Sequence, residues 1–400
     1  MDLRSGQPFS LLKNGLLANY PPISADQRCD VAIIGGGITG ALLAYRLTRA
    51  GIGVVVLDKR DIGMGSTAAS TSLLQYEIDA ELHALIDMVG EEHAVRAYRL
   101  GINAIDALER ITSDLGDDCD FQRKTSLYFA SEESDLARLQ QEYACRREHG
   151  FQVEYWDRAR IAESCSFEAA GAILSCGDAQ VDAFRLTHRL MQKAVAGGAR
   201  VYDRSEVTQV IASSEGIALE TERGPSVRAK QVVFATGYES QRYLKQKIGE
   251  LKSTYCVVTE PLEEFAGWPE RCLIWETSRP YFYARSTKDG RAIFGGEDTI
   301  FSSDHRRDRL LAKKTKRLCA RFVEMFPESK AEISYAWAGT FGETKDALAY
   351  IGRTPEWENA FFALGYGGNG VTYSAIAADI ITDLCLGKEN SDAAIFRFDR

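Results

Sequence analysis

The chain has 400 residues, a formal net charge of −9, 45% hydrophobic residues and 26% charged residues. This composition is typical of an ordinary globular protein, and the length exceeds what one compact core usually accommodates, so we expect two domains. The acidic balance and the lack of a dense basic run argue against nucleic acid as a partner, and no apolar run of about 18 residues is present to span a membrane.

The nine cysteines are scattered along the chain without a CxxC pair or a His/Cys cluster. Such spacing predicts neither a metal site nor a disulfide framework, and favours reduced thiols. Residues 1–14 are polar and lack the apolar core of a signal peptide. We therefore expect a cytoplasmic protein with no bound metal.

The most informative stretch runs from Asp30 to Asp58. Residues 31–34 form a short apolar run that predicts a buried parallel strand, residues 38–50 predict a helix, and residues 54–57 predict a second strand. Glycines lie between the first strand and the helix at the dinucleotide-binding spacing, at Gly35, Gly37 and Gly40. They permit a tight turn, close approach to a pyrophosphate, and close packing of the helix on the sheet.

Asp58 ends the second strand of this unit, where a carboxylate can accept hydrogen bonds from a ribose hydroxyl. A carboxylate there also disfavours NADP, because a 2′-phosphate would meet a negative charge. A glycine-rich turn alone is weak evidence. The complete order of strand, turn, helix, strand and acid predicts a dinucleotide site.

The next segments alternate between helical and strand patterns. Residues 59–71 are rich in Gly, Ser and Thr, which allows backbone to approach a flat ligand and donate to phosphate. Helices are predicted over 81–115, 132–150 and 185–196, and strands over 124–130, 207–211, 216–221 and 232–234. The last of these strands leads into the small residues 235–237, at a strand end of the kind where open α/β sheets bind cofactors.

Residues 251–300 predict a strand-rich region, followed by a helix over 304–326. Tyr281, Tyr283 and Arg285 share one face of a predicted strand, and such a face can hold a ligand or cover a core equally well. Near the C-terminus a strand over 361–364, a glycine-rich turn over 365–370 and an apolar helix over 371–386 form a second strand–glycine–helix junction. The start of that helix favours negative charge.

With these pieces in order, the chain resembles the D-amino-acid-oxidase-like family of FAD-dependent oxidoreductases, which includes glycine, sarcosine and γ-glutamylputrescine oxidases. The resemblance extends from Asp30 to about Gly387 and rests on four motifs: GGGITG, GSTAAS, FATG and GYGGNGVTYS. The stretch YARSTKDGRAIFGGED looks most like the γ-glutamylputrescine oxidase branch.

The resemblance implies an α/β (α+β overall) fold, with a Rossmann-like FAD-binding domain and a second, antiparallel-sheet substrate domain. The FAD-binding domain is expected to comprise residues 1–80, 165–240 and 335–400, and the substrate domain residues 81–164 and 241–334. The resemblance also implies the FAD contacts, which are Gly35, Gly37, Ile38, Thr39, Gly40, Asp58, Lys59, Arg60, Gly65, Ser66, Thr67, Val207, Ala235, Thr236, Gly237, Gly368, Asn369, Gly370, Val371 and Thr372.

Two positions depart from the family pattern. The arginine that clamps a substrate carboxylate in the family's amino-acid oxidases is replaced by Phe341, and no cysteine lies near Gly339 to bind flavin covalently. The second departure predicts non-covalent FAD. The first leaves Tyr283, Arg285 and Glu343 as candidate substrate-binding residues: Arg285 to hold a carboxylate, or Glu343 to attract an ammonium group. Glu343 is equally well explained as an ion-pair partner of Lys345 or another neighbour.

The predicted reaction is hydride transfer to flavin N5 from the C–H bond beside the nitrogen of a small amine or amino acid. Two alternatives remain within flavin chemistry: an FAD-dependent 2-hydroxy-acid dehydrogenase, and a flavin-binding subunit of a hetero-oligomeric dehydrogenase. An NAD-dependent dehydrogenase is disfavoured, because a nicotinamide enzyme has no need of the GSTAAS and GYGGNG segments. The sequence does not define the oligomeric state or the electron acceptor.

Overall fold

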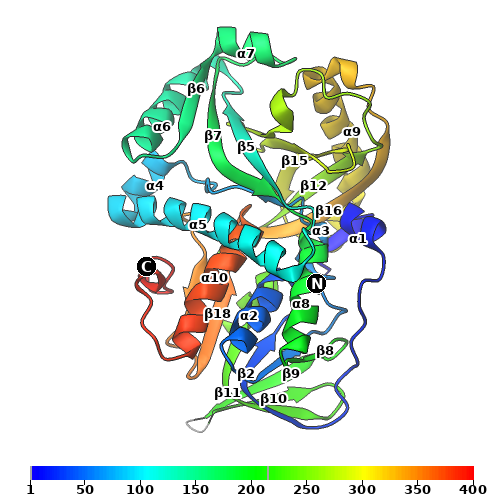
Figure 1. Cartoon of the computed structure of the whole chain (residues 1–400), viewed down its shortest axis with the longest axis vertical. Helices are drawn as coiled ribbons and strands as arrows, with labels where there is room; N and C mark the ends of the chain where they lie inside the picture. Colours follow the sequence, from blue (N-terminus) through cyan, green and yellow to red (C-terminus); the bar gives the residue numbers. More distant parts are fainter. Residues whose placement is uncertain (1, 214–215) are drawn as a thin grey trace.

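Two β-sheets organise the computed structural model, which describes residues 2–213 and 216–400 (Figure 1). The smaller sheet has eight strands, and its core is parallel. Its main strands in spatial order are β17 (Tyr350–Gly352), β18 (Ala360–Leu364), β11 (Ser226–Phe234), β2 (Gln27–Ile34), β3 (Val54–Leu57) and β8 (Arg200–Tyr202). From β11 the sheet continues antiparallel through β10 (Gly216–Thr221) to β9 (Val207–Ser213).

The central strands of this sheet are apolar because both of their faces are covered. Every residue of β3 and β18 is buried, as are the last four residues of β2. One face carries three helices, α2 (Ile38–Arg49), α8 (Ala183–Ala196) and α10 (Gly370–Cys385), which lie side by side in Figure 1. The predicted strand–helix–strand unit at residues 30–58 is therefore confirmed as β2, α2 and β3.

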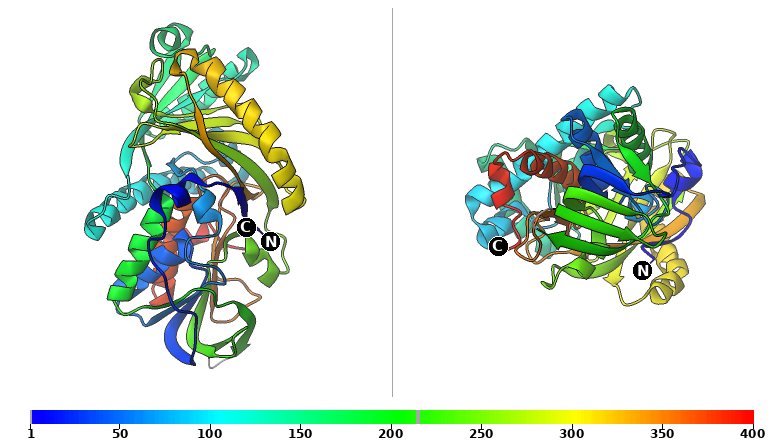
Figure 2. Two further views of the ribbon diagram at one scale, coloured as in Figure 1. Left: turned by 90° about the vertical axis from the view of Figure 1, so that its right-hand side faces the viewer. Right: turned by 90° about the horizontal axis from the view of Figure 1, so that it is seen from below.

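The larger sheet has ten strands and is mostly antiparallel. Its strands in spatial order are β1 (Arg4–Gly6), β16 (Ile333–Glu343), β12 (Glu250–Thr259), β15 (Ala292–Ile300), β14 (Phe282–Ser286), β13 (Leu273–Glu276), β5 (Gln122–Phe129), β7 (Gly171–Gln180) and β4 (Leu73–Leu74), with β6 (Val153–Asp157) paired to β7. Helix α9 (Asp304–Met325) packs on β12, β15 and β16, as the side view in Figure 2 shows. The fold class expected from the sequence is confirmed.

The remaining helices are short, except for the one that ends at Leu115. The helix predicted over 81–115 is two helices, α4 (Leu82–Val89) and α5 (Glu91–Leu115), because Gly90 adopts a φ of 83° that ends α4. The others are α1 (Phe9–Asn14), α3 (Ser66–Ala69), α6 (Leu136–Glu148), α7 (Arg158–Ser164) and the 3₁₀ turns η1 (Glu133–Asp135), η2 (Gly237–Tyr243), η3 (Pro269–Arg271), η4 (Pro327–Ser329) and η5 (Ser391–Ala394).

The chain crosses between the two sheets more often than the expected division into domains implies. Strands β1, β4 and β7 and most of β16 fall within residues 1–80, 165–240 and 335–400, although all four strands belong to the larger sheet. Strand β16 pairs with β12 along nearly its whole length, so hydrogen bonding places it there. We propose that the cofactor unit is built on the smaller sheet and its helices, and that these four strands complete the substrate unit.

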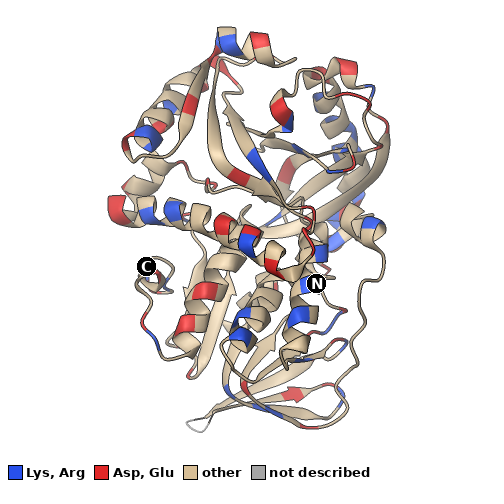
Figure 3. Ribbon diagram, viewed as in Figure 1, with Lys and Arg blue, Asp and Glu red and all other residues tan. Residues whose placement is uncertain are grey.

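Charged residues of both signs are interspersed over the two halves of the molecule (Figure 3). All nine cysteines lie in the described part of the chain and are unpaired. Among the described residues, no helix combines the length and apolarity needed to cross a bilayer.

A buried carboxylate, Glu142 of α6, holds the start of α4 in place. It accepts hydrogen bonds from the Leu82 N–H (2.9 Å), the His83 N–H (3.1 Å) and the Arg146 Nε (2.5 Å). Burial opposes ionisation of this group, but the Arg146 guanidinium, the His83 side chain and the Leu82 N–H outweigh burial and lower the Glu142 pKa to about 2.

We expect the Glu142 carboxylate to make the free energy of unfolding fall in acid. The folded-state pKa lies below the ordinary value of 4.5, so the stabilisation is fully present above pH 4.5 and is lost as pH falls toward about 2. Urea unfolding measured across this window is expected to show a steep acid limb that Glu142→Gln flattens. The matched change at exposed Glu148 on the same helix is expected to leave the limb unchanged, and equal flattening by both would contradict the assignment.

Candidate active site

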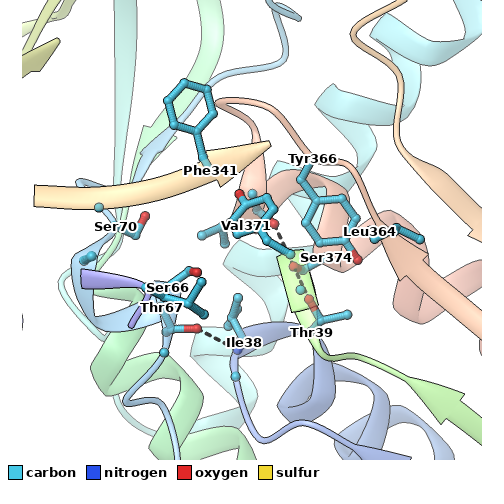
Figure 4. A pocket seen from close by; sticks show the side chains of 18 of the residues that line it. Ile38, Thr39, Ser66, Thr67, Ser70, Phe341, Leu364, Tyr366, Val371 and Ser374 are labelled. Carbon is cyan, nitrogen blue, oxygen red and sulfur yellow. Dashed lines mark hydrogen bonds between the residues drawn. The ribbon is translucent and has the colours of Figure 1, made fainter. Parts of the chain in front are cut away.

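The two sheets meet at a cavity of about 260 Å³. Its wall combines the carboxyl ends of parallel strands β2, β3, β11 and β18 with residues of β12, β14 and β16 from the larger sheet. Ligands bind at this edge in open α/β sheets, because strand ends and helix starts meet there. Figure 4 shows lining side chains from both sheets around this space.

Two glycines where β2 leads into α2 leave no space for a side chain. A Cβ on Gly35, which has a φ of 111°, would lie 2.3 Å from the Ala235 carbonyl oxygen, and a Cβ on Gly40 would lie 1.9 Å from the Gly35 carbonyl oxygen. Gly35 and Gly37 line the cavity, whereas Gly40 does not; its role is close packing of α2. Thr67 Oγ1 accepts a hydrogen bond from the Ile38 N–H at 3.0 Å and ties α3 to the start of α2 (Figure 4).

Asp58 lies at the cavity wall after β3, as the motif predicts. Its carboxylate accepts hydrogen bonds from the Gly36 N–H (2.6 Å) and the Arg60 N–H (2.8 Å). Burial raises the Asp58 pKa above its ordinary value, while these two backbone N–H groups oppose the rise. Lys59 and Arg60 line the same end, where both pair with Glu239, at 2.6 and 3.1 Å.

The small-residue segment after Asp58 also reaches the cavity. Gly65, Ser66 and Thr67 line it, and Ser66 Oγ is buried without a hydrogen-bond partner among the described residues. A buried hydroxyl without a partner is costly, and a ligand oxygen at this place would satisfy it. The other predicted contacts at this half, Thr39, Val207, Ala235, Thr236 and Gly237, also line the cavity.

At the opposite end, helix α10 begins at the cavity wall. Gly368, Asn369, Gly370 and Val371 line the cavity, and no side chain caps the first turn of the helix. Asn369 instead donates its amide to the Gln75 and Glu77 carbonyl oxygens, at 3.1 and 2.7 Å. Thr372 does not line the cavity; its Oγ1 donates to the Gln75 carbonyl oxygen at 3.4 Å, so it positions the neighbouring loop.

The three candidate substrate-binding residues separate in the structure. Tyr283 lines the cavity, with its hydroxyl 3.3 Å from Cys256 Sγ. Arg285 does not: it donates to the Thr71 and Ser286 carbonyl oxygens and faces a second cavity of about 20 Å³. Glu343 also lies outside the large cavity and pairs with Lys252, not with Lys345. Backbone carbonyl oxygens hold Arg285, and Lys252 of the neighbouring strand β12 holds Glu343, so neither side chain reaches the large cavity.

Sequence reasoning missed several residues that line the cavity near the start of α10 and on the larger sheet. They are Asp79, Tyr238, Thr254, Trp275 and Tyr366, and Tyr281 and Phe341 line the cavity with them. In Figure 4 the Phe341 ring projects from β16 and the Tyr366 ring lies above Thr39 and Ser374. These residues come from separate elements, so no local spacing joins them. Asp79 lies among other polar residues, Gln75, Glu77 and Glu81, so its polarity does not single it out in the sequence.

Three features occur together at this cavity. A glycine-rich turn lies at a helix start, an acid ends the next strand, and a second helix start faces an aromatic-lined wall. This combination defines a dinucleotide-dependent oxidoreductase. The model of the family described as FAD dependent oxidoreductase matches residues 30–384. The chain belongs to this family, and the resemblance deduced from its motifs is confirmed. The glycines that admit no Cβ and the unpartnered Ser66 hydroxyl fit FAD, which is the cofactor of the family.

Two relatives align over most of the chain. Glycine oxidase of Geobacillus kaustophilus is 28% identical over 93% of this chain and 97% of its own length. Gamma-glutamylputrescine oxidoreductase of Escherichia coli is 27% identical over 92% of this chain and 86% of its own length. The crystal structure of the Geobacillus kaustophilus glycine oxidase superposes with a TM-score of 0.80 at 24% identity, covering 94% of this chain and 99% of that one, which shows a shared fold.

Proposed function

We propose that this protein uses non-covalent FAD to oxidise the C–H bond beside the nitrogen of a small amine or amino acid. The observation that carries the proposal is one continuous cavity that joins the glycine-rich turn after β2 to an aromatic wall, past the start of α10. This wall includes Tyr283 of the larger sheet. The similarity to glycine oxidase and to gamma-glutamylputrescine oxidoreductase supports the amine or amino-acid substrate.

The protein's residues contribute binding, orientation and electrostatics. Gly35, Gly37 and Ser66 would hold the pyrophosphate, and Asp58 the ribose. The start of α10 would stabilise negative charge nearby, by about 0.3–1 kcal/mol and at most roughly 2 kcal/mol. When bound, FAD supplies the acceptor for the two electrons and the hydrogen that leave the C–H bond, and water then hydrolyses the resulting imine.

The aromatic side chains around the substrate would exclude water and orient the reacting C–H bond. Transfer of a hydride from that bond depends more on orientation than on a strong base. Among the described residues that line the cavity, none is histidine or cysteine. The lack of a lining cysteine or histidine supports non-covalent binding of FAD. Oxidation of a 2-hydroxy acid is less well supported, because Arg285, the proposed carboxylate anchor, faces a different cavity.

The unpaired cysteines support our proposal of a cytoplasmic location.

We expect the purified protein to show flavin absorption that passes entirely to the supernatant on acid precipitation. Anaerobic addition of small primary or secondary amines is then expected to bleach the flavin band, and 2-hydroxy acids are expected to leave it unchanged. The two steps are measured by visible absorption on the same preparation.

Each outcome has a distinct meaning. Colour retained in the acid pellet would refute non-covalent binding. Bleaching by 2-hydroxy acids but not by amines would refute the proposed reaction and favour the hydroxy-acid alternative. Bleaching that occurs only after another chain is added would assign this protein to a hetero-oligomeric dehydrogenase.

A further inference from the structure

The charged side chains that line the large cavity differ between its two ends. At the end next to Asp58, the cations Lys59 and Arg60 are balanced by Glu239. At the end next to α10, the lining is mainly aromatic and includes the carboxylate of Asp79. The aromatic members are Tyr238, Trp275, Tyr281, Tyr283, Phe341 and Tyr366. The substrate side of the cavity therefore has acidic character.

The Asp79 carboxylate is held in a defined position. Its Oδ2 accepts a hydrogen bond from the Gly368 N–H at 2.8 Å, and its Oδ1 lies 3.5 Å from the Tyr281 hydroxyl, which donates to it. A Cβ on Gly367 would lie 2.7 Å from Oδ2, so the glycine turn before α10 leaves the space that the carboxylate occupies. Asp79 is only partly buried, which leaves it accessible from the cavity.

No Lys, Arg or His of the described residues forms an ion pair with this carboxylate. The cation next to it, Arg279, donates to the Asp79 backbone carbonyl oxygen at 3.2 Å and stacks on the Tyr281 ring at 4.6 Å. Arg279 is exposed and does not line the cavity. Glu77, the other carboxylate at this end, already pairs with Arg146 at 3.2 Å. Asp79 is thus the lining carboxylate at this end that has no cation of the protein bound to it.

We propose that Asp79 and Tyr281 bind a positively charged nitrogen of the substrate that is distinct from the nitrogen beside the oxidised C–H bond. The substrate is then an amine with a second cationic nitrogen, such as a diamine, and not an amino acid held by its carboxylate. This inference rests on the proposed function and deepens it. It also accounts for Phe341, which lines the same cavity, since an arginine there would add a second cation to the cavity.

The chemistry separates the two nitrogens. A carboxylate stabilises the protonated form of a nearby amine, and the face of a tyrosine ring attracts the same cation. Oxidation of the C–H bond requires a free electron pair on the adjacent nitrogen, which a protonated amine lacks. A nitrogen bound to Asp79 is therefore an anchor, and the reacting nitrogen lies elsewhere on the same molecule.

The first experiment uses three probes that share a tert-butyl group and differ in charge, on the holoenzyme. These are tert-butylammonium, tert-butanol and pivalate; the ammonium probe has no C–H bond on the carbon next to nitrogen and cannot be oxidised. Titration is followed by perturbation of the visible flavin spectrum and by calorimetry. We expect tert-butylammonium to bind at least about 10-fold more tightly than either other probe, the low end for a hydrogen bond to a charged group. Tighter binding of pivalate would overturn the proposal.

The second experiment compares diaminobutane with butylamine in anaerobic bleaching of the wild-type holoenzyme and of Asp79→Asn. We expect the variant to raise the half-saturating concentration of diaminobutane by about 10- to 100-fold and to leave that of butylamine unchanged. Asp87→Asn removes the same charge from an exposed position on α4 and is expected to change neither value. The flavin content and spectrum of all three proteins are measured in parallel.

The outcomes distinguish this inference from the proposed function. Equal losses for both amines, or loss of FAD from Asp79→Asn, would place Asp79 at the reacting centre or at the cofactor and overturn the anchor role. Bleaching by butylamine with no preference for the diamine would overturn the inference alone. Bleaching by no amine would refute the proposed function, and comparing the tert-butylammonium titration of the wild type with that of Asp79→Asn would still decide whether Asp79 binds a cation.

Discussion

Gly40→Ala is expected to abolish FAD binding and to lower stability. The added methyl group would lie 1.9 Å from the Gly35 carbonyl oxygen, which belongs to backbone and cannot move aside as a side chain does. Helix α2 would have to shift away from the end of β2, at a cost of at least about 1–3 kcal/mol for overpacking. The shift would also open the turn that approaches the pyrophosphate. The measurements are flavin content after gel filtration and urea unfolding of the apoprotein.

Gly370→Ala is the matched control for the steric part of this argument. It lies in the first turn of α10, and a Cβ there meets no atom within 4 Å. We expect the stability of its apoprotein to equal that of the wild type. If Gly40→Ala also unfolded like the wild type, close packing of α2 would not be the reason for this glycine.

Arg146→Met is expected to reduce the free energy of unfolding by about 3–5 kcal/mol, the usual effect of removing one partner from a buried ion pair. The Arg146 side chain is fully buried and bonds to Glu142 and Glu77, at 2.5 and 3.2 Å. Asp178 lies in the same cluster, where burial and the neighbouring Glu77 raise its pKa well above the ordinary value. Without the guanidinium, Glu77 would be buried without its cation, and Glu142 would keep only His83. Thermal and urea unfolding measure the loss.

Two further variants test the origin of this loss. Arg96→Met breaks an ion pair with Asp392, but the Arg96 side chain is 46% exposed, so we expect a cost of about 1 kcal/mol or less. The triple change Arg146→Met, Glu142→Gln and Glu77→Gln removes the uncompensated charges and is expected to recover part of the stability. A triple variant less stable than Arg146→Met would show that packing, not charge, causes the effect.

The cofactor half of the site was largely predictable because its determinants are local. Strand, turn and helix in residues 30–58 follow directly from an apolar run, three glycines and an acid at fixed spacing, and the structure places Gly35, Gly37 and Asp58 at one cavity. The glycine-rich turn before α10 is a local signal of the same kind. Each motif predicts its own strand end, and parallel strands place their carboxyl ends at one edge of the sheet.

The residues of the substrate half could not be predicted from local sequence patterns. Periodicity placed Tyr281, Tyr283 and Arg285 on one strand face, yet only the two tyrosines line the large cavity. Glu343 appeared suited to bind an ammonium group, but β16 pairs with β12 in a register that brings it to Lys252. Spacing along one strand does not reveal which charges the neighbouring strand supplies.

The sequence by itself thus determined the FAD-binding unit, the mixed α/β class and the family, since all three depend on contacts between residues close together in the chain. Only the tertiary structure decided which carboxylate lies at the aromatic end of the cavity without a cation of the described residues bound to it. Asp79 meets Tyr281 and Gly368 across sequence separations of 202 and 289 residues, through the pairing of the larger sheet and the docking of α10. Such contacts are set by how whole elements pack, and packing leaves no periodic trace in the residues that it brings together.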